Sequence, residues 1–214
     1  MAVERRWPGE TFVILASGPS LTLNDVDACR GKARVVAINH GGFIAPWADV
    51  LYACDGAWWK RHDGAPSFQG LKFGLTLPPI RWMKTNPISQ TIHFLKPVPC
   101  AGIDTDPTRL CTGGGQDGAG NSGHQAIGLA VHLGARRILL LGYDMHADPK
   151  GKRNWHQPDT PTRSPYREFQ RGYPKLSAAA LALGVEIVNC SRQTALTCFP
   201  RQQLDQALSV AVAA

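Results

Sequence analysis

Five short runs of apolar residues, each followed by a glycine or a polar residue, constrain the fold of this chain more than any other feature. A continuous apolar run of this length that ends at a turn signal is typical of a strand buried on both faces, and such strands occur in parallel sheets. Helical segments separate several of the runs, as the right-handed crossovers between parallel strands require. The runs lie within Phe12–Leu21, Arg34–Asn39, Asp49–Asp55, Arg137–Asp144 and Val185–Asn189.

The pattern therefore predicts an α/β fold: a single Rossmann-like domain over residues 1–214 with a mainly parallel sheet flanked by helices. Between residues 64 and 117 the pattern weakens, and only Leu71–Leu75 and Thr91–Leu95 have the character of short strands. We expect residues 64–117 to form an irregular or β insertion. Residues 145–164 have no apolar period, which indicates a lid-like loop or a solvated flexible loop.

Composition narrows the class of protein. The chain has 214 residues and 43% apolar content, enough for one sizeable core. There is no apolar run of about 18 residues, so we expect no membrane span, and the first residues lack the apolar core of a signal peptide, which predicts a cytoplasmic protein. The six cysteines are scattered without a C-x-x-C pair, so we predict small, mostly buried hydrophobes rather than a zinc site or a disulfide scaffold.

The charge of the chain is strongly basic. A formal net charge of +7 favours anionic partners such as nucleotides, phosphorylated sugars or nucleic acid. Seven basic residues fall within residues 150–175, where aromatic side chains interleave with them. This interleaving keeps nucleic acid as a less favoured alternative to a nucleotide-type small molecule.

Polar residues follow the predicted strands at their carboxyl ends. Ser17, Asn39, Asp55 and Asp144 each occupy such a position. Parallel sheets bind ligands in the crevice outside this edge. Four polar residues on one edge predict a ligand site more strongly than any one of them does.

The first strand runs into a turn of small residues, Ser17–Ser20. Gly18 would let a ligand approach the backbone, and Ser17 and Ser20 offer hydroxyls. Thr22 and Asp25 have the spacing of a capping box, so a helix should start here and present free N–H groups to an anion. The turn thus predicts a phosphate pocket. An ordinary turn with no ligand is the alternative.

A second phosphate-like stretch is Gly113–Gly123, which is rich in glycine but lacks the Lys-Ser/Thr of a P-loop. It leads into a predicted helix over Ser122–Leu133 that Asn121 or Ser122 can cap. We expect this helix N-terminus to face a nucleotide or an anionic substrate, against the alternative of a disordered glycine loop. His124 and His132 lack the spacing of a metal pair and should be half-exposed, with His124 close enough to the helix start to reach a ligand.

Two further patterns have competing interpretations. Asp104 and Asp106 form a D-x-D pair that could hold Mg²⁺ or Mn²⁺ against a diphosphate, but Asp106-Pro107 is also a turn signature, and the turn is favoured. Trp58 and Trp59 lie on a probable short helix, as core residues or as a stacking surface, with the core favoured.

Taken in order, these motifs resemble the bacterial sialyltransferases with a single Rossmann-like domain, the flagellin glycosyltransferases of the motility-associated-factor type and the archaeal hydroxymethylpterin diphosphokinases. Each motif is weak alone, and the order and spacing carry the resemblance, which covers about half of the chain. The matching pieces are Val13–Leu21, Val35–Asn39, Asp49–Asp55, Asn121–Asp144 and Val185–Ser191.

The resemblance implies a nucleotide site. In it Ser17, Gly18, Pro19 and Ser20 would face the phosphate, Asn39 and Asp55 would face the nucleoside or the donor sugar, and Asn121, Ser122 and Gly123 would hold the base or ribose. In the sialyltransferases the donor would be a CMP-sugar and no metal is required.

The chain departs from these families at two places. Ser17 replaces the asparagine with which the sialyltransferase turn begins. The family's catalytic histidine would fall near Tyr166, whereas His146 and His156 lie in the same segment but out of register. Asp55 fits the flagellin-transferase and pterin-kinase branches better than the sialyltransferase branch.

Three hypotheses follow. The first is a glycosyltransferase-like enzyme that uses a nucleotide-activated sugar, with His156 as the general base and Asp144 and Tyr166 as further catalytic candidates. The second is an Mg²⁺-dependent diphosphotransferase, which would draw on Asp55, Asp104, Asp106 and Asp144. The third is a non-catalytic accessory protein that retains the fold.

Overall fold

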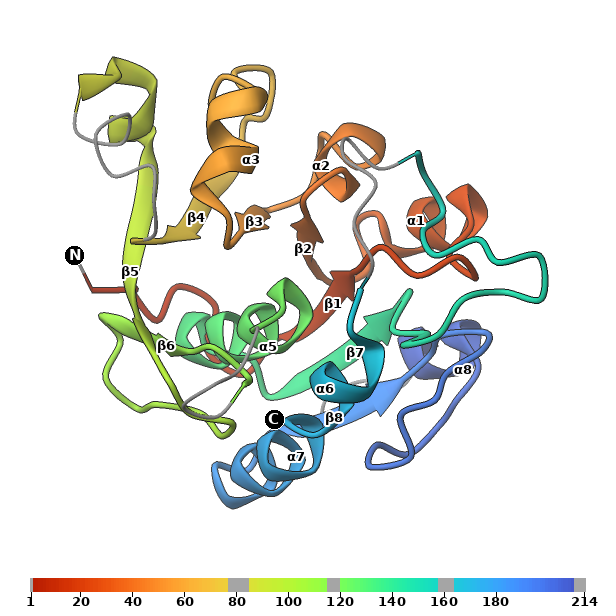
Figure 1. Cartoon of the computed structure of the whole chain (residues 1–214). Coiled ribbons are helices and arrows are strands. Elements are labelled where there is room, and N and C mark those ends of the chain that lie inside the picture. The colour runs from red at the N-terminus through yellow and green to blue at the C-terminus, as the bar shows by residue number, and fades with distance from the viewer. Residues whose placement is uncertain (1, 77–84, 115–119, 158–163, 210–214) are drawn as a thin grey trace.

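A computed structural model of the chain, which describes residues 2–76, 85–114, 120–157 and 164–209, contains one eight-stranded sheet in which every pairing is parallel. The strand order is β6-β5-β4-β3-β2-β1-β7-β8. From β1 the chain builds the sheet outward in one direction to β6, then returns to the other side of β1 for β7 and β8 (Figure 1). The order reverses between β1 and β7, and the prediction of a parallel α/β sheet flanked by helices is confirmed.

Most of the described helices and strands lie where the apolar runs and the helix caps predict them. The strands are β1 (Thr11–Leu15), β2 (Arg34–Ile38), β3 (Val50–Ala53), β4 (Leu71–Leu75), β5 (Ile92–Val98), β6 (Arg109–Cys111), β7 (Arg137–Leu141) and β8 (Glu186–Asn189). The helices are α1 (Leu23–Cys29), α2 (Gly41–Ile44), α3 (Gly56–Arg61), a 3₁₀ turn (Pro87–Thr91), α5 (Ser122–Leu133), α6 (Tyr166–Gln170), α7 (Tyr173–Ala182) and α8 (Leu204–Ser209).

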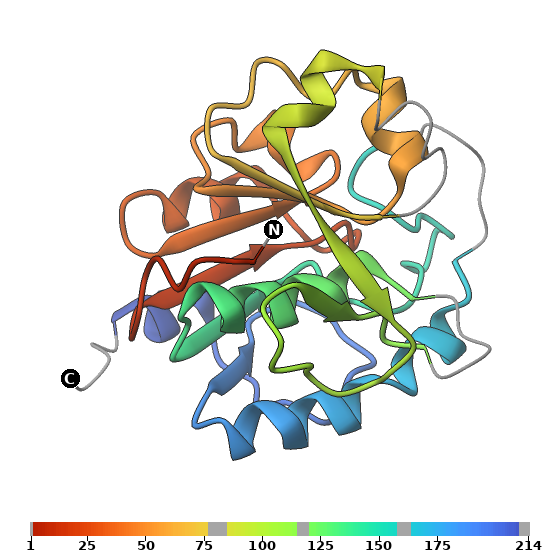
Figure 2. The same cartoon turned by 90° about the vertical axis from the view of Figure 1, so that its left-hand side faces the viewer.

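The sheet has a hydrophobic core on each face, which is why its central strands are apolar at consecutive positions. Along β1, Phe12 and Ile14 pack on one side while Val13 and Leu15 pack on the other. Residues of α5 and α7 cover the first face, and residues of α1, α3 and α8 cover the second. Figure 2 shows α5 and α7 below the central strands β1 to β4 and α3 above these strands.

The segment expected to form an insertion, residues 64–117, instead supplies three strands of the sheet. β4 pairs with β3, β5 with β4, and β6 with β5, all in parallel register. The expected strands at 71–75 and 91–95 correspond to β4 and the first part of β5, and residues 77–84 and 115–117 lie outside the described residues. In the expected lid, residues 145–157 and 164 contain no helix or strand, and residues 158–163 also lie outside that description.

The cysteines depart from the sequence expectation at one pair. Cys100, just after β5, and Cys111, the last residue of β6, form a disulfide, so the prediction of small, buried hydrophobes is wrong for this pair. Cys29 and Cys190 are buried free thiols, and burial raises the pKa of Cys29 to about 12 and that of Cys190 to about 11. Among the described helices, none has the length and apolarity needed to cross a membrane.

Candidate functional site

A pocket of about 370 Å³ lies at the carboxyl edge of the sheet, on both sides of the point where the strand order reverses. Residues that follow β1, β2, β3 and β7 line it, together with the start of α5. Both its size and its place are typical of ligand sites in open parallel sheets. Nine of the residues predicted from the sequence line it: Ser17, Gly18, Asn39, Asp55, Asn121, Ser122, Gly123, His156 and Tyr166.

The remaining predicted residues, Pro19, Ser20 and Asp144, are not part of the lining. Asp144 is buried, and its carboxylate accepts a hydrogen bond from the backbone N–H of Ser20 at 3.1 Å. Burial raises the pKa of the Asp144 carboxyl, and the hydrogen bonds from Ser20 offset part of that rise. Asp144 therefore positions the turn after β1, although the sequence made it a catalytic candidate.

The turn after β1 leaves fewer backbone donors for a ligand than its sequence indicates. Gly18 donates its N–H to the carbonyl of Gly142 at 2.8 Å, and the N–H of Ser20 is taken by Asp144. A Cβ at Gly18 would overlap both the Asp144 carboxylate and the Gly142 carbonyl, so only glycine fits. The turn contributes Ser17 and Gly18 to the pocket lining but does not present a row of free N–H groups to it.

The first helix also begins later than a phosphate-binding turn would require. The Thr22 hydroxyl accepts the N–H of Asp25 and the Asp25 carboxylate accepts the N–H of Thr22, so the predicted capping box is confirmed. This box sits at the start of α1, at Leu23, beyond Ser17–Ser20. The N-terminus of α1 is thus closed by its own cap, and its donors are not directed to the pocket.

The N-terminus of α5 does reach the pocket, and Asn121 caps it. Its Oδ1 accepts two hydrogen bonds, from the N–H of His124 at 2.9 Å and from the hydroxyl of Tyr173 at 2.9 Å. Because Oδ1 is held by two donors, the amide NH₂ must point the other way. Asn121 is 9% exposed, and its Nδ2 has no hydrogen-bond partner within the part of the chain that the structure describes. A buried, oriented donor of this kind needs an acceptor, which a ligand in the pocket would provide.

Buried side chains fix the first turn of α5 against the sheet. The Tyr143 hydroxyl donates to the carbonyl of Gly123 at 2.9 Å, and the Tyr52 hydroxyl donates to the Gln125 side chain at 2.9 Å. A Cβ at Gly123 would come within 3.0 Å of Asn121 Oδ1, so this position also favours glycine. The N–H groups of the first helical turn are consequently held in place on a rigid element.

Imidazole rings form one wall of the pocket. His156, predicted as the general base, stacks on His40 with ring centroids 4.1 Å apart and planes inclined by 17°. The His40 ring also meets the edge of His62 at 5.2 Å, and Trp58 lies beside both. Sequence reasoning missed His40, although it directly follows Asn39 at the carboxyl end of β2.

Tyr166 and Arg153 form a pair on another part of the wall. The Tyr166 hydroxyl donates to the carbonyl of Arg153 at 3.1 Å, and the Arg153 guanidinium lies 5.7 Å from the centre of the tyrosine ring. Arg153 and Arg61 both line the pocket, whereas the lining described here contains a single carboxylate, Asp55. Asp55 caps α3 by accepting the N–H of Ala57 at 2.9 Å. The balance of charge suits an anionic ligand.

The D-x-D pair lies away from this pocket. Asp104 and Asp106 accept hydrogen bonds from nearby backbone N–H groups and contact the Arg109 guanidinium at 3.3 and 3.0 Å. This is the favoured turn interpretation. In the described ranges no group of three or more His, Cys, Asp or Glu side chains is placed to hold a metal ion.

The two histidines of α5 differ from the expectation. His124 is 1% exposed, and its Nε2 lies 2.9 Å from the carbonyl oxygen of Ala101, so the prediction of a half-exposed ring is wrong. The helix is buried on nearly all sides at this end, a condition that periodicity alone does not reveal. His132 is half-buried, with Nε2 at 3.2 Å from the carbonyl of Arg109. Trp58 and Trp59 are core residues as expected, and Trp58 also lines the pocket.

The fold and the pocket define an all-parallel α/β protein with a basic cavity at the carboxyl edge of its sheet. Comparisons with protein-family models, with curated proteins and with solved structures find no match for this chain. The function is therefore argued from the pocket and its residues.

Proposed function

We propose that this chain is a glycosyltransferase-like enzyme that binds a nucleotide-activated sugar in the pocket at the carboxyl edge of the sheet. One observation carries the proposal: a single pocket joins the oriented Asn121 amide and the start of α5 to a wall that contains His156 and Arg153. The Asn121 amide and the start of α5 suit a nucleotide, and His156 and Arg153 suit the chemistry of transfer.

The nucleotide would be held at the α5 side of the pocket. The NH₂ of Asn121 would donate to an oxygen or ring nitrogen of the base or ribose, and the first N–H groups of α5, at Ser122 and Gly123, have no partner within the helix. Arg153 and Arg61 would contact the phosphate. A CMP-sugar, which carries one phosphate, is the donor that the motif resemblance favours.

Transfer would use the imidazole wall. His156 would take the proton from an acceptor hydroxyl while the hydroxyl oxygen forms a bond to the anomeric carbon of the sugar. The bond between that carbon and the phosphate oxygen breaks, and the nucleotide leaves with the electron pair. The guanidinium of Arg153 would stabilise the charge that develops on the leaving phosphate.

The diphosphotransferase hypothesis has less support from the geometry. Of its four carboxylates, Asp55 alone lines the pocket, Asp144 lies beneath the turn after β1, and Asp104 and Asp106 contact Arg109. Mg²⁺ bound between phosphates needs at least one or two protein carboxylates. Asp55 could supply one carboxylate ligand to Mg²⁺, and a ligand diphosphate would have to supply most of the other oxygen ligands.

Thermal unfolding with a panel of CMP, CDP, UDP, GDP and ATP, each with and without Mg²⁺, tests the proposal. Binding to the folded chain stabilises it by RT ln(1 + [L]/Kd), so millimolar ligand reveals even weak sites. Stabilisation by a nucleotide without Mg²⁺ supports the sugar-nucleotide proposal, and stabilisation that requires Mg²⁺ supports the diphosphotransferase. No response to any nucleotide contradicts both and favours the accessory protein, and a short oligonucleotide in the same panel tests nucleic acid.

A further inference from the structure

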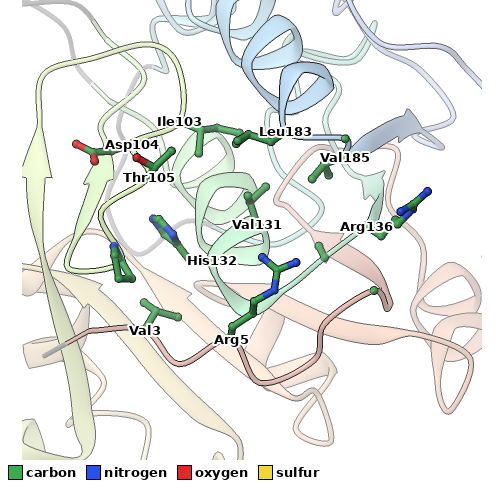
Figure 3. Close-up of a pocket in the computed structure, with 14 residues that line it drawn as sticks. Val3, Arg5, Ile103, Asp104, Thr105, Val131, His132, Arg136, Leu183 and Val185 are labelled. Carbon is green, nitrogen blue, oxygen red and sulfur yellow. The ribbon is translucent and has the colours of Figure 1, made fainter. Parts of the chain in front are cut away.

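A second pocket, of about 490 Å³, lies at the other end of the sheet, near the amino ends of β1, β7 and β8. Four segments enclose it: the chain before β1, the loop between β5 and β6, the last turn of α5 and the end of α7 (Figure 3). One helix thus borders both pockets, because Asn121–Gly123 at its start line the first and Val131 and His132 near its end line the second.

Backbone hydrogen bonds hold the walls of this second pocket in place. The N–H of Val3 donates to the carbonyl of Pro107 at 2.9 Å, which joins the chain before β1 to the β5–β6 loop. The N–H groups of Trp7 and Gly9 donate to the carbonyls of Leu133 and Gly134, each at 2.8 Å, which joins the same segment to the end of α5. These hydrogen bonds join the segments that form the walls of the pocket.

Its interior is largely apolar, and a large apolar side chain is exposed on its rim. Leu183 is 46% exposed. The apolar lining comes from all four segments and consists of Val3, Ile103, Val131, Ala135, Leu183 and Val185.

The charge at the second pocket is positive. Asp104 is the carboxylate of the described lining, and Arg109 contacts it at 3.3 Å. Arg5 and Arg136 also line the pocket, and within the described ranges neither guanidinium has a hydrogen-bond or ion-pair partner. Figure 3 shows Arg5 reaching along the cavity below Val131 and Arg136 at the rim beyond Val185. The pocket therefore combines an apolar body with two unmatched cationic groups.

We propose that this second pocket binds a small amphipathic anion, with an apolar body against Val131, Leu183 and Val185 and a carboxylate or phosphate head on Arg5. Arg136 adds positive charge at the rim. Apolar walls with a few convergent polar groups are the usual composition of a small-molecule site of this size. A guanidinium recognises either head group through paired N–H donors. The site is separate from the one proposed for the nucleotide, since the two pockets lie at opposite ends of the strands.

Titration of the full chain with sodium octanoate, octyl phosphate and octan-1-ol, followed by amide NMR shifts, tests this site. Saturable shifts at Gly9, Ala135 and Gly184, with either anion binding more tightly than the alcohol, are expected, and the tighter anion identifies the head group. Arg5→Gln should weaken the anion roughly fivefold, the scale of one partly exposed ion pair. Arg171→Gln, at an exposed arginine outside both linings, is the matched control and should bind normally.

Leu183→Ser provides a second variant at an exposed position, where folding is not at risk. It should weaken all three compounds together, because it removes apolar contact common to them. Equal binding of octanol and the anions would contradict the role of the guanidinium groups. Shifts confined to Gly18 and Gly142, or affinity unchanged in both Arg5→Gln and Leu183→Ser, would overturn the site itself.

Discussion

The hydroxyl of Tyr173 donates a hydrogen bond to Oδ1 of Asn121 across 2.9 Å, in the core directly behind the pocket at the carboxyl edge. The two residues are far apart in the sequence, on α7 and at the cap of α5, and this contact sets the orientation of the Asn121 amide. Tyr173 itself is not part of the pocket lining. Its hydroxyl instead orients the amide of Asn121, which does line the pocket.

Tyr173→Phe should therefore affect binding as well as stability. Loss of one buried hydrogen bond to Asn121 should lower the free energy of unfolding by about 1 kcal/mol. With one donor fewer on Oδ1, the NH₂ group is less firmly oriented, so nucleotide affinity should fall severalfold. Urea unfolding and nucleotide titration measure the two effects. Tyr52→Phe is the control, because it also loses a buried hydroxyl bond, to Gln125, but does not touch Asn121; equal losses of affinity in both variants would contradict the orienting role.

Gly18→Ala should destabilise the chain by about 3 kcal/mol. The added Cβ would overlap the Asp144 carboxylate and the carbonyl of Gly142, which belong to the segment after β7 that packs against the turn after β1, so the backbone must shift. Gly128→Ala in α5 is a matched control, since its Cβ would meet only Leu110 at an ordinary 3.5 Å. That variant should be neutral or more stable by up to about 1 kcal/mol, because alanine favours the helix. Thermal unfolding of both variants gives the comparison.

The free energy of unfolding should fall in mild acid, because unfolding allows His124 to take up a proton. Burial lowers its pKa to about 4, although bonds to backbone carbonyls act in the other direction. The unfolded chain, with a histidine pKa near 6.5, binds this proton first, so stability is full above about pH 6.5 and is lost as the pH falls toward 4. A histidine pKa lowered from near 6.5 to about 4 corresponds to about 3 kcal/mol of stability.

The comparison that isolates this effect is the native chain against His124→Gln, followed by urea unfolding between pH 4 and 8. The native chain should lose more stability toward pH 4 than the variant does. Asp144 acts oppositely, because its raised pKa favours the protonated folded form in acid, but it is present in both proteins and cancels. Parallel pH profiles would show that His124 does not titrate as its burial requires.

Reduction of the bond between Cys100 and Cys111 should also cost stability. The two cysteines are separated by 11 positions in the sequence. A bond across a loop of this length lowers the conformational entropy of the unfolded chain and so stabilises the folded state by about 3 kcal/mol. Denaturant unfolding with and without a phosphine reductant measures the difference. The Cys100→Ser/Cys111→Ser double variant should match the reduced protein and be insensitive to reductant; a native chain that is equally insensitive would contradict the bond.

The central part of the fold was predictable because its strands are buried on both faces. In β1, β2, β3 and β7 every residue after the first is buried, which yields the continuous apolar runs. The strands nearer the edge carry a weaker signal. β5 has an exposed Lys96 and four half-buried residues, His93, Phe94, Pro97 and Val98, beside its buried Ile92 and Leu95, so it lacks the continuous apolar run of a core strand.

The site was predictable in location more than in detail. Parallel strands bring their carboxyl ends to one edge, so Ser17, Asn39 and Asp55 could be expected to converge. The sequence does not determine whether a carboxylate at that edge faces a ligand or the backbone, and Asp144 faces the backbone. Likewise, His156 stacks on His40 because the segment after β7 lies against the residues that follow β2. No local sequence pattern predicts such a long-range contact.

His156→Ala should separate binding from chemistry. If this imidazole is the general base, transfer from the nucleotide-sugar should slow by roughly 10²–10⁴-fold while nucleotide affinity changes little, since the Asn121 side of the pocket is intact. His93→Ala, on β5 and outside the lining, is the control and should retain the native rate. A native rate in His156→Ala would remove His156 from catalysis. If transfer is lost in His40→Ala and not in His156→Ala, His40 is the general base instead. The two rings lie 4.1 Å apart on the same wall, so His40 could take this role.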